Sequence, residues 1–124
     1  MYVTQSADQR PPVVARRGRG AVILTLSGEF DLDTIAPVTA AFDQAMTGPE
    51  VVVVDLEGVS FADSTMVNLL LQAHRALGTR FRLAAPSPPV QRLIDLLGLD
   101  RVLHLHASVD EALAAGPSAP SDSD

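Results

Sequence analysis

The stretch of residues 51–77, VVVVDLEGVSFADSTMVNLLLQAHRAL, constrains the fold more than any other part of the chain. It opens with four consecutive valines, a β-branched run that is typical of a strand buried on both faces of a parallel sheet. We expect the chain to leave this strand at residues 55–58 (DLEG). The first half of the stretch therefore predicts a short buried strand followed by a turn, with Val59 and Phe61 as apolar anchors for that turn.

The second half of the stretch predicts a helix at about residues 64–77. Asp63, Ser64 and Thr65 are three consecutive residues of the type that caps helix N-termini, and an apolar pattern with helical spacing follows them. Ser64 is therefore expected at a corner between strand, turn and helix, with its hydroxyl near the helix N-terminus. We expect the functional site at this corner.

The predicted helix carries more apolar surface than one contact with a sheet requires. Its core face repeats at helical spacing and consists of Val67, Leu70, Leu71, His74 and Leu77. Met66, Leu69 and Ala73 form a second apolar stripe, and Thr65 and Asn68 lie on the polar side. Two interpretations of the second stripe stay open. Either another helix or loop covers it, or Met66 and Leu69 stay partly exposed as a docking surface for a partner.

Alternating strand and helix patterns predict a small α/β domain at residues 10–115. Strands are expected at residues 13–15, 21–27, 80–85 and 102–105, and helices at residues 34–47, 90–97 and 108–115. Together with residues 51–77 they give a mixed sheet of four or five strands and about four helices, which follow the second to fifth strands. We expect a flexible N-terminus at residues 1–9 and a disordered acidic tail at residues 116–124, because the tail has nothing to bury.

Asp31 and Asp33 lie between the second strand and the first helix. As helix caps, each would stabilise the positive helix end by about 0.3–1 kcal/mol. Asp31 is also expected at the same end of the sheet as Ser64, because both follow the carboxyl ends of strands. In open α/β sheets, sites lie at that end by default.

Composition excludes several classes of function. The formal net charge of −6 argues against a nucleic-acid interface. The chain has no cysteine and no lysine, which excludes disulfides, thiol catalysis, a Walker-type phosphate loop and a lysine Schiff base. Its apolar runs are far shorter than the ~18 residues of a membrane span, and it opens with no secretory pattern. We therefore expect a cytoplasmic protein with no membrane partner.

The histidines and an arginine-rich segment are weaker site candidates. His104 and His106 share one strand face but lack a third metal ligand of evident position. His74 faces the core, where a packed, hydrogen-bonded side chain is a simpler interpretation than a catalytic base. Residues 16–20 (RRGRG) indicate a solvated turn in preference to an anion-binding patch. We therefore expect no metal and no cofactor.

Ser64 lacks the setting of a hydrolase nucleophile. An esterase elbow needs the pattern G-x-S-x-G, a base placed against the serine and an oxyanion hole. Ala62 and Met66 occupy the two glycine positions, and the sequence places no histidine to serve the serine. From the residues alone, the favoured interpretation of Ser64 is a helix cap, worth about 1 kcal/mol.

Two separated motifs resemble those of bacterial anti-sigma factor antagonists, the small STAS-domain proteins. Residues 55–70 resemble the family pattern DL-x-x-V-x-F-x-D-S-[ST]-G-L-G, in which the serine after the aspartate is the phosphorylated one. Residues 28–31 (GEFD), followed by Thr34, resemble the marker G-E-[LF]-D, and residues 87–99 resemble the third helix of the family. Met66 and Asn68 depart from the pattern, since they stand at the positions of two family glycines.

The resemblance, which covers about residues 10–115, implies a STAS-like fold and a binding protein that is not an enzyme. It implies an anti-sigma factor antagonist in a partner-switching module, which binds an anti-sigma factor serine kinase when unphosphorylated. The kinase would end the complex by phosphorylating Ser64, and a serine phosphatase would reset it. The resemblance assigns Asp63 and Asp31 to shaping the site, and the interpretation of the helix assigns Thr65, Met66, Asn68 and Leu69 to the partner interface.

One alternative belongs to a different class. A constitutive STAS scaffold or sensor module would bind another protein or a small ligand without phosphorylation. Met66 in place of a glycine favours this alternative. Incubation with ATP and a cognate kinase distinguishes the two functions, because only the partner-switching protein would gain a phosphate.

Overall fold

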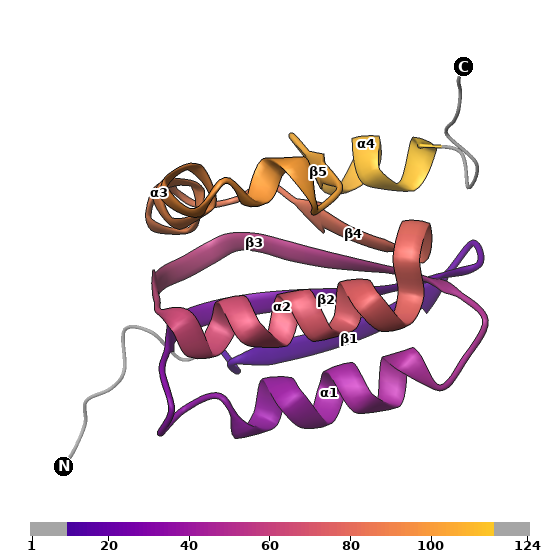
Figure 1. Cartoon of the computed structure of the whole chain (residues 1–124). Helices are drawn as coiled ribbons and strands as arrows, with labels where there is room; N and C mark the ends of the chain where they lie inside the picture. The colour runs from indigo at the N-terminus through magenta and orange to yellow at the C-terminus, as the bar shows by residue number, and fades with distance from the viewer. Residues whose placement is uncertain (1–9, 116–124) are drawn as a thin grey trace, which may run out of the picture.

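Strands and helices alternate along residues 10–115, the part of the chain that the computed structural model describes (Figure 1). The segments expected to be flexible or disordered, residues 1–9 and 116–124, lie outside the described residues. The strands are β1 (Val13–Gly18), β2 (Ala21–Phe30), β3 (Val51–Ala62), β4 (Phe81–Ala84) and β5 (Leu105–His106). The helices are α1 (Ala36–Met46), α2 (Ser64–Leu77), α3 (Pro88–Leu97) and α4 (Val109–Ala114), with 3₁₀ turns η1 (Gly78–Arg80) and η2 (Leu99–Arg101).

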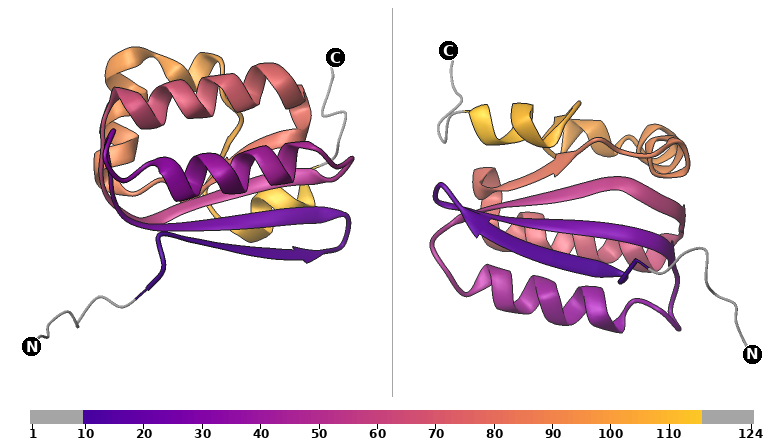
Figure 2. Two further views of the ribbon diagram at one scale, coloured as in Figure 1. Left: turned by 90° about the horizontal axis from the view of Figure 1, so that it is seen from below. Right: turned by 180° about the vertical axis from the view of Figure 1, so that it is seen from behind.

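The described strands form one mixed sheet in the order β1-β2-β3-β4-β5. β1 and β2 are an antiparallel hairpin, whereas β2 to β5 run parallel to one another. Parallel neighbours need crossover connections, and α1, α2 and α3 lie in these connections. α1 and α2 lie side by side over one face of the sheet, and α4 lies on the other (Figures 1 and 2). The predicted fold class is therefore confirmed.

Apolar side chains are buried on both faces of the sheet. The larger cluster packs between the sheet and the helices α1, α2 and α3, and includes Leu24 and Val54 at 1% and 0% exposure. The smaller cluster consists of Val53, Ala84 and Ala112, under α4. On this second face Ile23 of β2 still packs against the smaller cluster, whereas no helix of the described chain lies over β1 in the rear view of Figure 2.

β3 is longer than the sequence predicts, so two expectations about it are wrong. The chain does not leave the strand at residues 55–58, because β3 continues to Ala62 with irregularities in its register against β2. Gly58 permits this continuation, since a Cβ there would lie 2.9 Å from the Leu26 carbonyl oxygen. Val59 is buried, but Phe61 is 46% exposed and is therefore no anchor.

Two other strand boundaries also differ from the prediction. β1 continues to Gly18, and the hairpin turn consists of Arg19 and Gly20, whose φ angles are +57° and +76°. Positive φ at both central residues is typical of the turns that match the twist of paired strands. The last strand is limited to Leu105–His106, and Val102 lies before it at 45% exposure.

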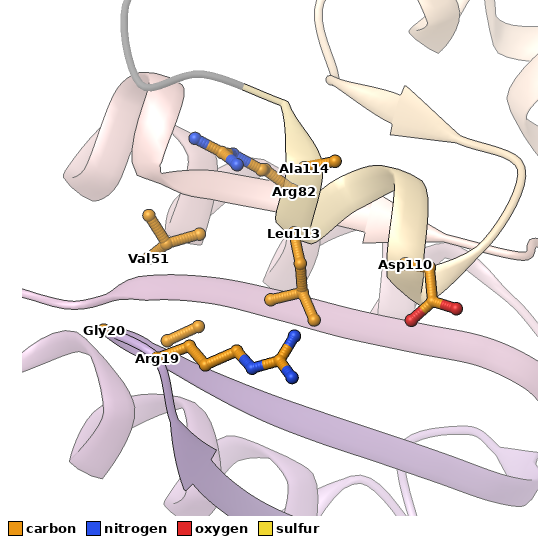
Figure 3. A pocket seen from close by; sticks show the side chains of 8 residues that line it. Arg19, Gly20, Val51, Arg82, Asp110, Leu113 and Ala114 are labelled. Atoms are coloured by element: carbon orange, nitrogen blue, oxygen red, sulfur yellow. The ribbon is translucent and has the colours of Figure 1, made fainter.

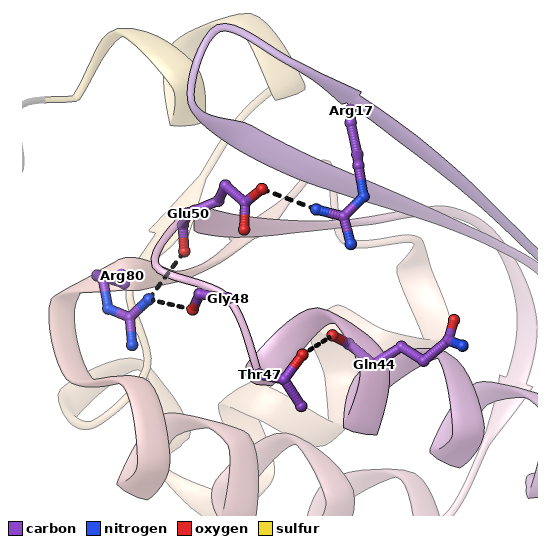
Figure 4. A network of polar contacts seen from close by, with 6 residues as sticks. All are labelled: Arg17, Gln44, Thr47, Gly48, Glu50 and Arg80. Carbon is purple, nitrogen blue, oxygen red and sulfur yellow. Dashed lines mark hydrogen bonds and ion pairs between the residues drawn. The ribbon is translucent and has the colours of Figure 1, made fainter.

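Two arginines fix the loop between α1 and β3 (Figure 4). Arg80 Nη1 donates hydrogen bonds to the carbonyl oxygens of Gly48 (3.1 Å) and Glu50 (3.0 Å). Arg17 of β1 forms an ion pair with the Glu50 carboxylate at 2.7 Å. These contacts join the hairpin, the loop and η1 at the edge of the sheet where β3 begins.

Candidate functional site

The corner between β3 and α2 presents Ser64 as the first residue of the helix. Asp63 is the N-cap residue, with an extended backbone, and its Oδ1 accepts a hydrogen bond from the backbone N–H of Thr65 at 2.9 Å. Ser64 is exposed. The interpretation of Ser64 as the helix cap is therefore wrong, because Asp63 has that role. The Ser64 hydroxyl is left at the accessible N-terminal end of α2.

Asp31 lies at the same end of the sheet as this corner, as the sequence predicts. Phe30 at the end of β2 pairs with Ala62 at the end of β3, so residues 31 and 63 leave neighbouring parallel strands at the same level. The expected capping by Asp31 and Asp33 is wrong, because α1 begins only at Ala36 and its N-cap residue makes no side-chain hydrogen bond. The carboxylate of Asp31 has a different structural role.

That role is to hold the loop between β2 and α1. Asp31 Oδ1 accepts hydrogen bonds from the backbone N–H groups of Asp33 (2.9 Å) and Thr34 (3.1 Å). The Thr34 hydroxyl accepts from the Asp31 N–H (2.9 Å) and donates to the Glu29 carbonyl (2.9 Å). We call residues 31–34 the Asp31 loop. Because its polar groups bond to one another, the loop has a defined shape next to the Ser64 corner.

Two exposed apolar side chains at this end of the sheet were not assigned to the site from the sequence. Leu32 in the Asp31 loop is 79% exposed, and Phe61, next to the last residue of β3, is 46% exposed. The signal for Leu32 is an apolar residue inside the polar segment D-L-D-T. Leu32 and Phe61 therefore add accessible apolar surface to this end of the sheet.

The predicted interface residues of α2 separate into an exposed and a buried pair. Asn68 is exposed and Thr65 is half-buried, so both are accessible next to Ser64. Met66 and Leu69 are only 1% and 8% exposed, so the expectation that they stay exposed for docking is wrong. Both side chains belong to the larger apolar cluster, so the other interpretation, in which neighbouring elements cover this stripe, is the correct one. α1 lies alongside α2 (Figure 1).

The histidines lie away from Ser64. His74 is ten residues further along α2, about 15 Å at 1.5 Å per residue, and its ring lies 5.5 Å from that of His104. Its Nδ1 is buried without a hydrogen-bond partner among the described residues, so the expected hydrogen-bonded core role is not met. Burial, and to a smaller extent the charges of His104 and Arg75, lower the pKa of His74. Within residues 10–115, no three potential ligand side chains converge on a metal site.

A cavity of about 400 Å³ lies at the opposite edge of the sheet from Ser64 (Figure 3). Ala21 and Val51, the first residues of β2 and β3, line it together with Arg19 and the residues of α4 that face the sheet. The Ser64 corner follows the last residue of β3 and so lies at the other end of these strands, away from this cavity.

The order of strands and helices and the corner with Asp63 and Ser64 define the class of protein. The STAS domain family model matches residues 12–112, which is most of the chain. The chain therefore belongs to the STAS domain family. None of the helices within residues 10–115 has the length and apolar character of a membrane span.

Within this family, the chain is similar to anti-sigma factor antagonists. It is 29% identical over 111 residues to the anti-sigma-F factor antagonist RsfB of Mycobacterium tuberculosis, which covers 87% of this chain and 91% of that protein. The crystal structure of an anti-sigma factor antagonist from Mycobacterium paratuberculosis has a TM-score of 0.77 at 28% identity, covering 83% and 91% of the two chains. SpoIIAA of Bacillus, solved in unphosphorylated and phosphorylated forms, gives TM-scores of 0.67 and 0.62 at 27% and 26% identity, covering 82% of this chain and 92% and 96% of SpoIIAA.

Proposed function

We propose that the chain is an anti-sigma factor antagonist in a partner-switching module. Its unphosphorylated form binds an anti-sigma factor serine kinase in the cytoplasm and so frees a sigma factor. Phosphorylation of Ser64 by that kinase ends the complex, and a serine phosphatase restores the binding form. The chain acts as substrate and binding partner, without catalysis of its own. The exposure of Ser64 at the N-terminus of α2 carries the proposal, because a kinase requires an accessible hydroxyl.

The relatives support the two halves of this proposal separately. The names of the Mycobacterium proteins support binding to an anti-sigma factor. The two forms of SpoIIAA, one of them phosphorylated, support a covalent switch. The likeness of the D-S-T motif to the family pattern supports Ser64 as the phosphoacceptor.

The position of Ser64 explains why phosphate would act on binding more than on folding. A phosphoserine adds about −1.5 to −2 charges at pH 7. At a helix N-terminus this charge meets unpaired backbone N–H groups and the positive end of the helix dipole, so the folded chain accommodates it. A partner that covers the corner must instead desolvate the phosphate.

Charge at the corner makes that desolvation costly. Asp63 and Asp31 already contribute two carboxylates at this end of the sheet. A phosphate between them and a partner adds like-charge repulsion and unpaired buried charge, which together cost several kcal/mol. A loss of about 3 kcal/mol corresponds to a weakening of binding by roughly a hundredfold.

We assign the partner surface to the accessible side chains around Ser64. Thr65, Asn68, Leu32 and Phe61 supply it, two of them polar and two apolar. Met66 and Leu69 contribute only from beneath, by packing α2 against the core.

The test measures phosphorylation and binding on the same samples. The purified chain is incubated with ATP and, in turn, with each anti-sigma factor serine kinase encoded in its genome, and the intact mass is recorded. We expect one phosphate with one of these kinases, its loss in Ser64→Ala, and its retention in the matched control Thr65→Ala. Titration calorimetry should then show binding of that kinase at least about a hundredfold weaker for the phosphorylated chain. Phosphate on Thr65, or equal affinities of the two forms, contradicts the proposal.

The second candidate function is a scaffold or sensor module that is never phosphorylated. Asn68 favours it, because this exposed side chain occupies a family glycine position on the proposed partner surface. Met66 no longer favours it, because its side chain points away from that surface into the core. Stable binding of a partner without phosphate transfer from any of the kinases supports this second function.

A further inference from the structure

The face of the sheet opposite α1 and α2 combines a protruding helix with an uncovered strand. α4 packs over Val53 and Ala84 of β3 and β4, whereas no helix of the described chain lies over β1 (Figure 2). A cavity of about 350 Å³ lies between α4 and the hairpin of β1 and β2. We call this hollow the β1 trough, and its lining includes Arg16, Ile23, Val109, Asp110 and Leu113.

Apolar side chains remain accessible in and beside the β1 trough. Side chains alternate between the two faces of a strand, so Val14 lies on the same face of β1 as Arg16, which lines the trough. Val14 is 40% exposed. Ile23 of β2 and Leu113 of α4 are only half-buried. An element that covers the trough would therefore remove apolar surface from water, which favours association.

The charges on this face are divided between its two sides. Arg16 and Arg19 lie on the hairpin side, and Figure 3 shows the Arg19 side chain extended toward α4. Asp110 of α4 lies on the other side, where Asp55 and Glu57 of β3 line a neighbouring cavity with it. Among the described residues, Arg16, Arg19 and Asp110 have no ion-pair partner. The hairpin side is therefore positive and the α4 side negative.

This combination of shape and charge matches a second copy of the same chain. A two-fold axis that lies in the interface, between α4 and β1, would place α4 of each copy in the β1 trough of the other. The same rotation would bring the positive hairpin side of each copy against the negative α4 side of the other. Two-fold dimers are built from such self-complementary surfaces, and complementary charges fix their register. A uniformly acidic or basic partner would match only half of this face.

We propose that the chain forms a two-fold symmetric dimer through this face. α4 of each protomer packs over β1 of its partner, and Arg16 forms an ion pair with the partner's Asp110. The rotation repeats this ion pair on the other side of the axis. α2 lies on the opposite face of the sheet, so the Ser64 corners of both protomers stay accessible in the dimer (Figure 1).

Sedimentation velocity of the full chain, at concentrations up to about 0.5 mM, measures the self-association. We expect a reversible equilibrium between monomer and dimer. Arg16→Glu and Asp110→Arg should each weaken the dimer at least about tenfold, because like charges then meet twice across the axis. An equimolar mixture of the two variants should restore association, because both pairs then join opposite charges.

Matched controls make the same charge changes away from this face. Arg92→Glu on α3 and Asp43→Arg on α1 alter exposed side chains and should leave the dimer unchanged. Far-UV circular dichroism verifies that each variant is folded. A chain that stays monomeric over the whole concentration range overturns the proposal. A dimer that the controls weaken as much as Arg16→Glu and Asp110→Arg do, or a mixture of those two variants that does not associate, also decides against it.

Discussion

Met66 and Asn68 both stand at family glycine positions, yet the fold uses them in opposite ways. Met66 is 1% exposed within the larger apolar cluster, whereas Asn68 is exposed. A helical wheel identifies both apolar stripes of α2, but it does not show which neighbouring elements pack against each stripe. This is why the burial of Met66 and Leu69 could not be predicted from the sequence alone.

We therefore expect opposite responses to substitution at these two positions. Met66→Ala should lower the free energy of unfolding by about 2–5 kcal/mol, because it leaves a cavity in the core. Asn68→Gly should lower it by less than about 0.5 kcal/mol, the difference in helix propensity at an exposed site. Urea denaturation of both variants checks this, and equal losses would contradict the assignment of Met66 to the core.

His74 should make the fold sensitive to mildly acidic pH. Burial lowers its pKa below the ordinary 6.5, and His104 and Arg75 disfavour its protonated form further. The unfolded chain thus binds a proton more readily than the folded chain, so the free energy of unfolding falls as the pH decreases below about 6.5. The thermal midpoint of the wild type should decrease between pH 7.5 and 5.5.

The variant His74→Gln isolates this contribution. It should reduce the loss of thermal midpoint on acidification without removing it, because burial also lowers the pKa of His106. An identical pH dependence in His74→Gln and wild type would show that His74 does not carry the effect.

Among the elements, β3 shows most clearly how much the sequence can predict. The four valines correctly predict its buried first half. Its second half lacks that signal, because the strand continues through acidic residues and Gly58. The need for glycine there comes from a close approach of β2, since the Leu26 carbonyl oxygen would lie 2.9 Å from any Cβ at residue 58. Such a contact between segments distant in sequence cannot be inferred from local pattern.

A buried arginine of β4 holds α4 in place. The alternation of polar and apolar residues along β4 does not predict this burial. Arg82 is 4% exposed, and its Nη1 donates to the carbonyl oxygens of Ala112 (2.7 Å) and Ala115 (2.6 Å). These carbonyls belong to the last turn of α4 and the residue after it. Arg82 therefore satisfies acceptors that a helix C-terminus otherwise leaves without partners.

We expect Arg82→Met to destabilise the fold by about 1.5–3 kcal/mol, the usual contribution of hydrogen bonds from a charged donor. Amide hydrogen exchange should accelerate first in α4. Arg92→Met on the exposed side of α3 is the matched control and should change stability by less than about 0.5 kcal/mol. Unchanged exchange in α4 of the Arg82 variant would mean that Arg82 does not hold this helix.

Asp63 combines a structural and an electrostatic role that two substitutions separate. Asp63→Ala removes the cap of α2 and should cost about 0.5–2 kcal/mol. Asp63→Asn keeps a capping oxygen but removes the charge, so stability should stay close to the wild type. Chemical denaturation compares the two, and equal destabilisation would show that the charge, and not the cap, supports the helix.

At the scale of the molecule, the parallel register of β2 and β3 brings the candidate site residues to one end of the sheet. The sequence predicts that Asp31 and Ser64 lie at the same end of the sheet, and the pairing of Phe30 with Ala62 confirms it. The sequence does not predict the exposed Leu32 and Phe61, because exposure depends on which elements remain uncovered after packing. Local motifs thus indicate where the candidate site lies, and packing decides which side chains it presents.

The whole fold should tolerate phosphate at Ser64. Stabilisation at the positive helix end offsets repulsion from Asp63 and Asp31, so the net change should stay below about 1 kcal/mol. This corresponds to a shift of the thermal midpoint of less than roughly 4 °C for a chain of 124 residues. Scanning calorimetry of the two forms tests this expectation, and unfolding of the phosphorylated chain would replace the binding switch with a folding switch.

The Asp31 loop has a consequence for divergence among related regulators in one cell. Its shape depends on the bonds of Asp31 and Thr34, while Leu32 projects outward at 79% exposure. Replacement of this leucine therefore alters the surface chemistry without disturbing the scaffold. On the partner surface proposed above, duplicated copies of such a gene would diverge in partner choice at this position first, which would limit crosstalk between parallel circuits.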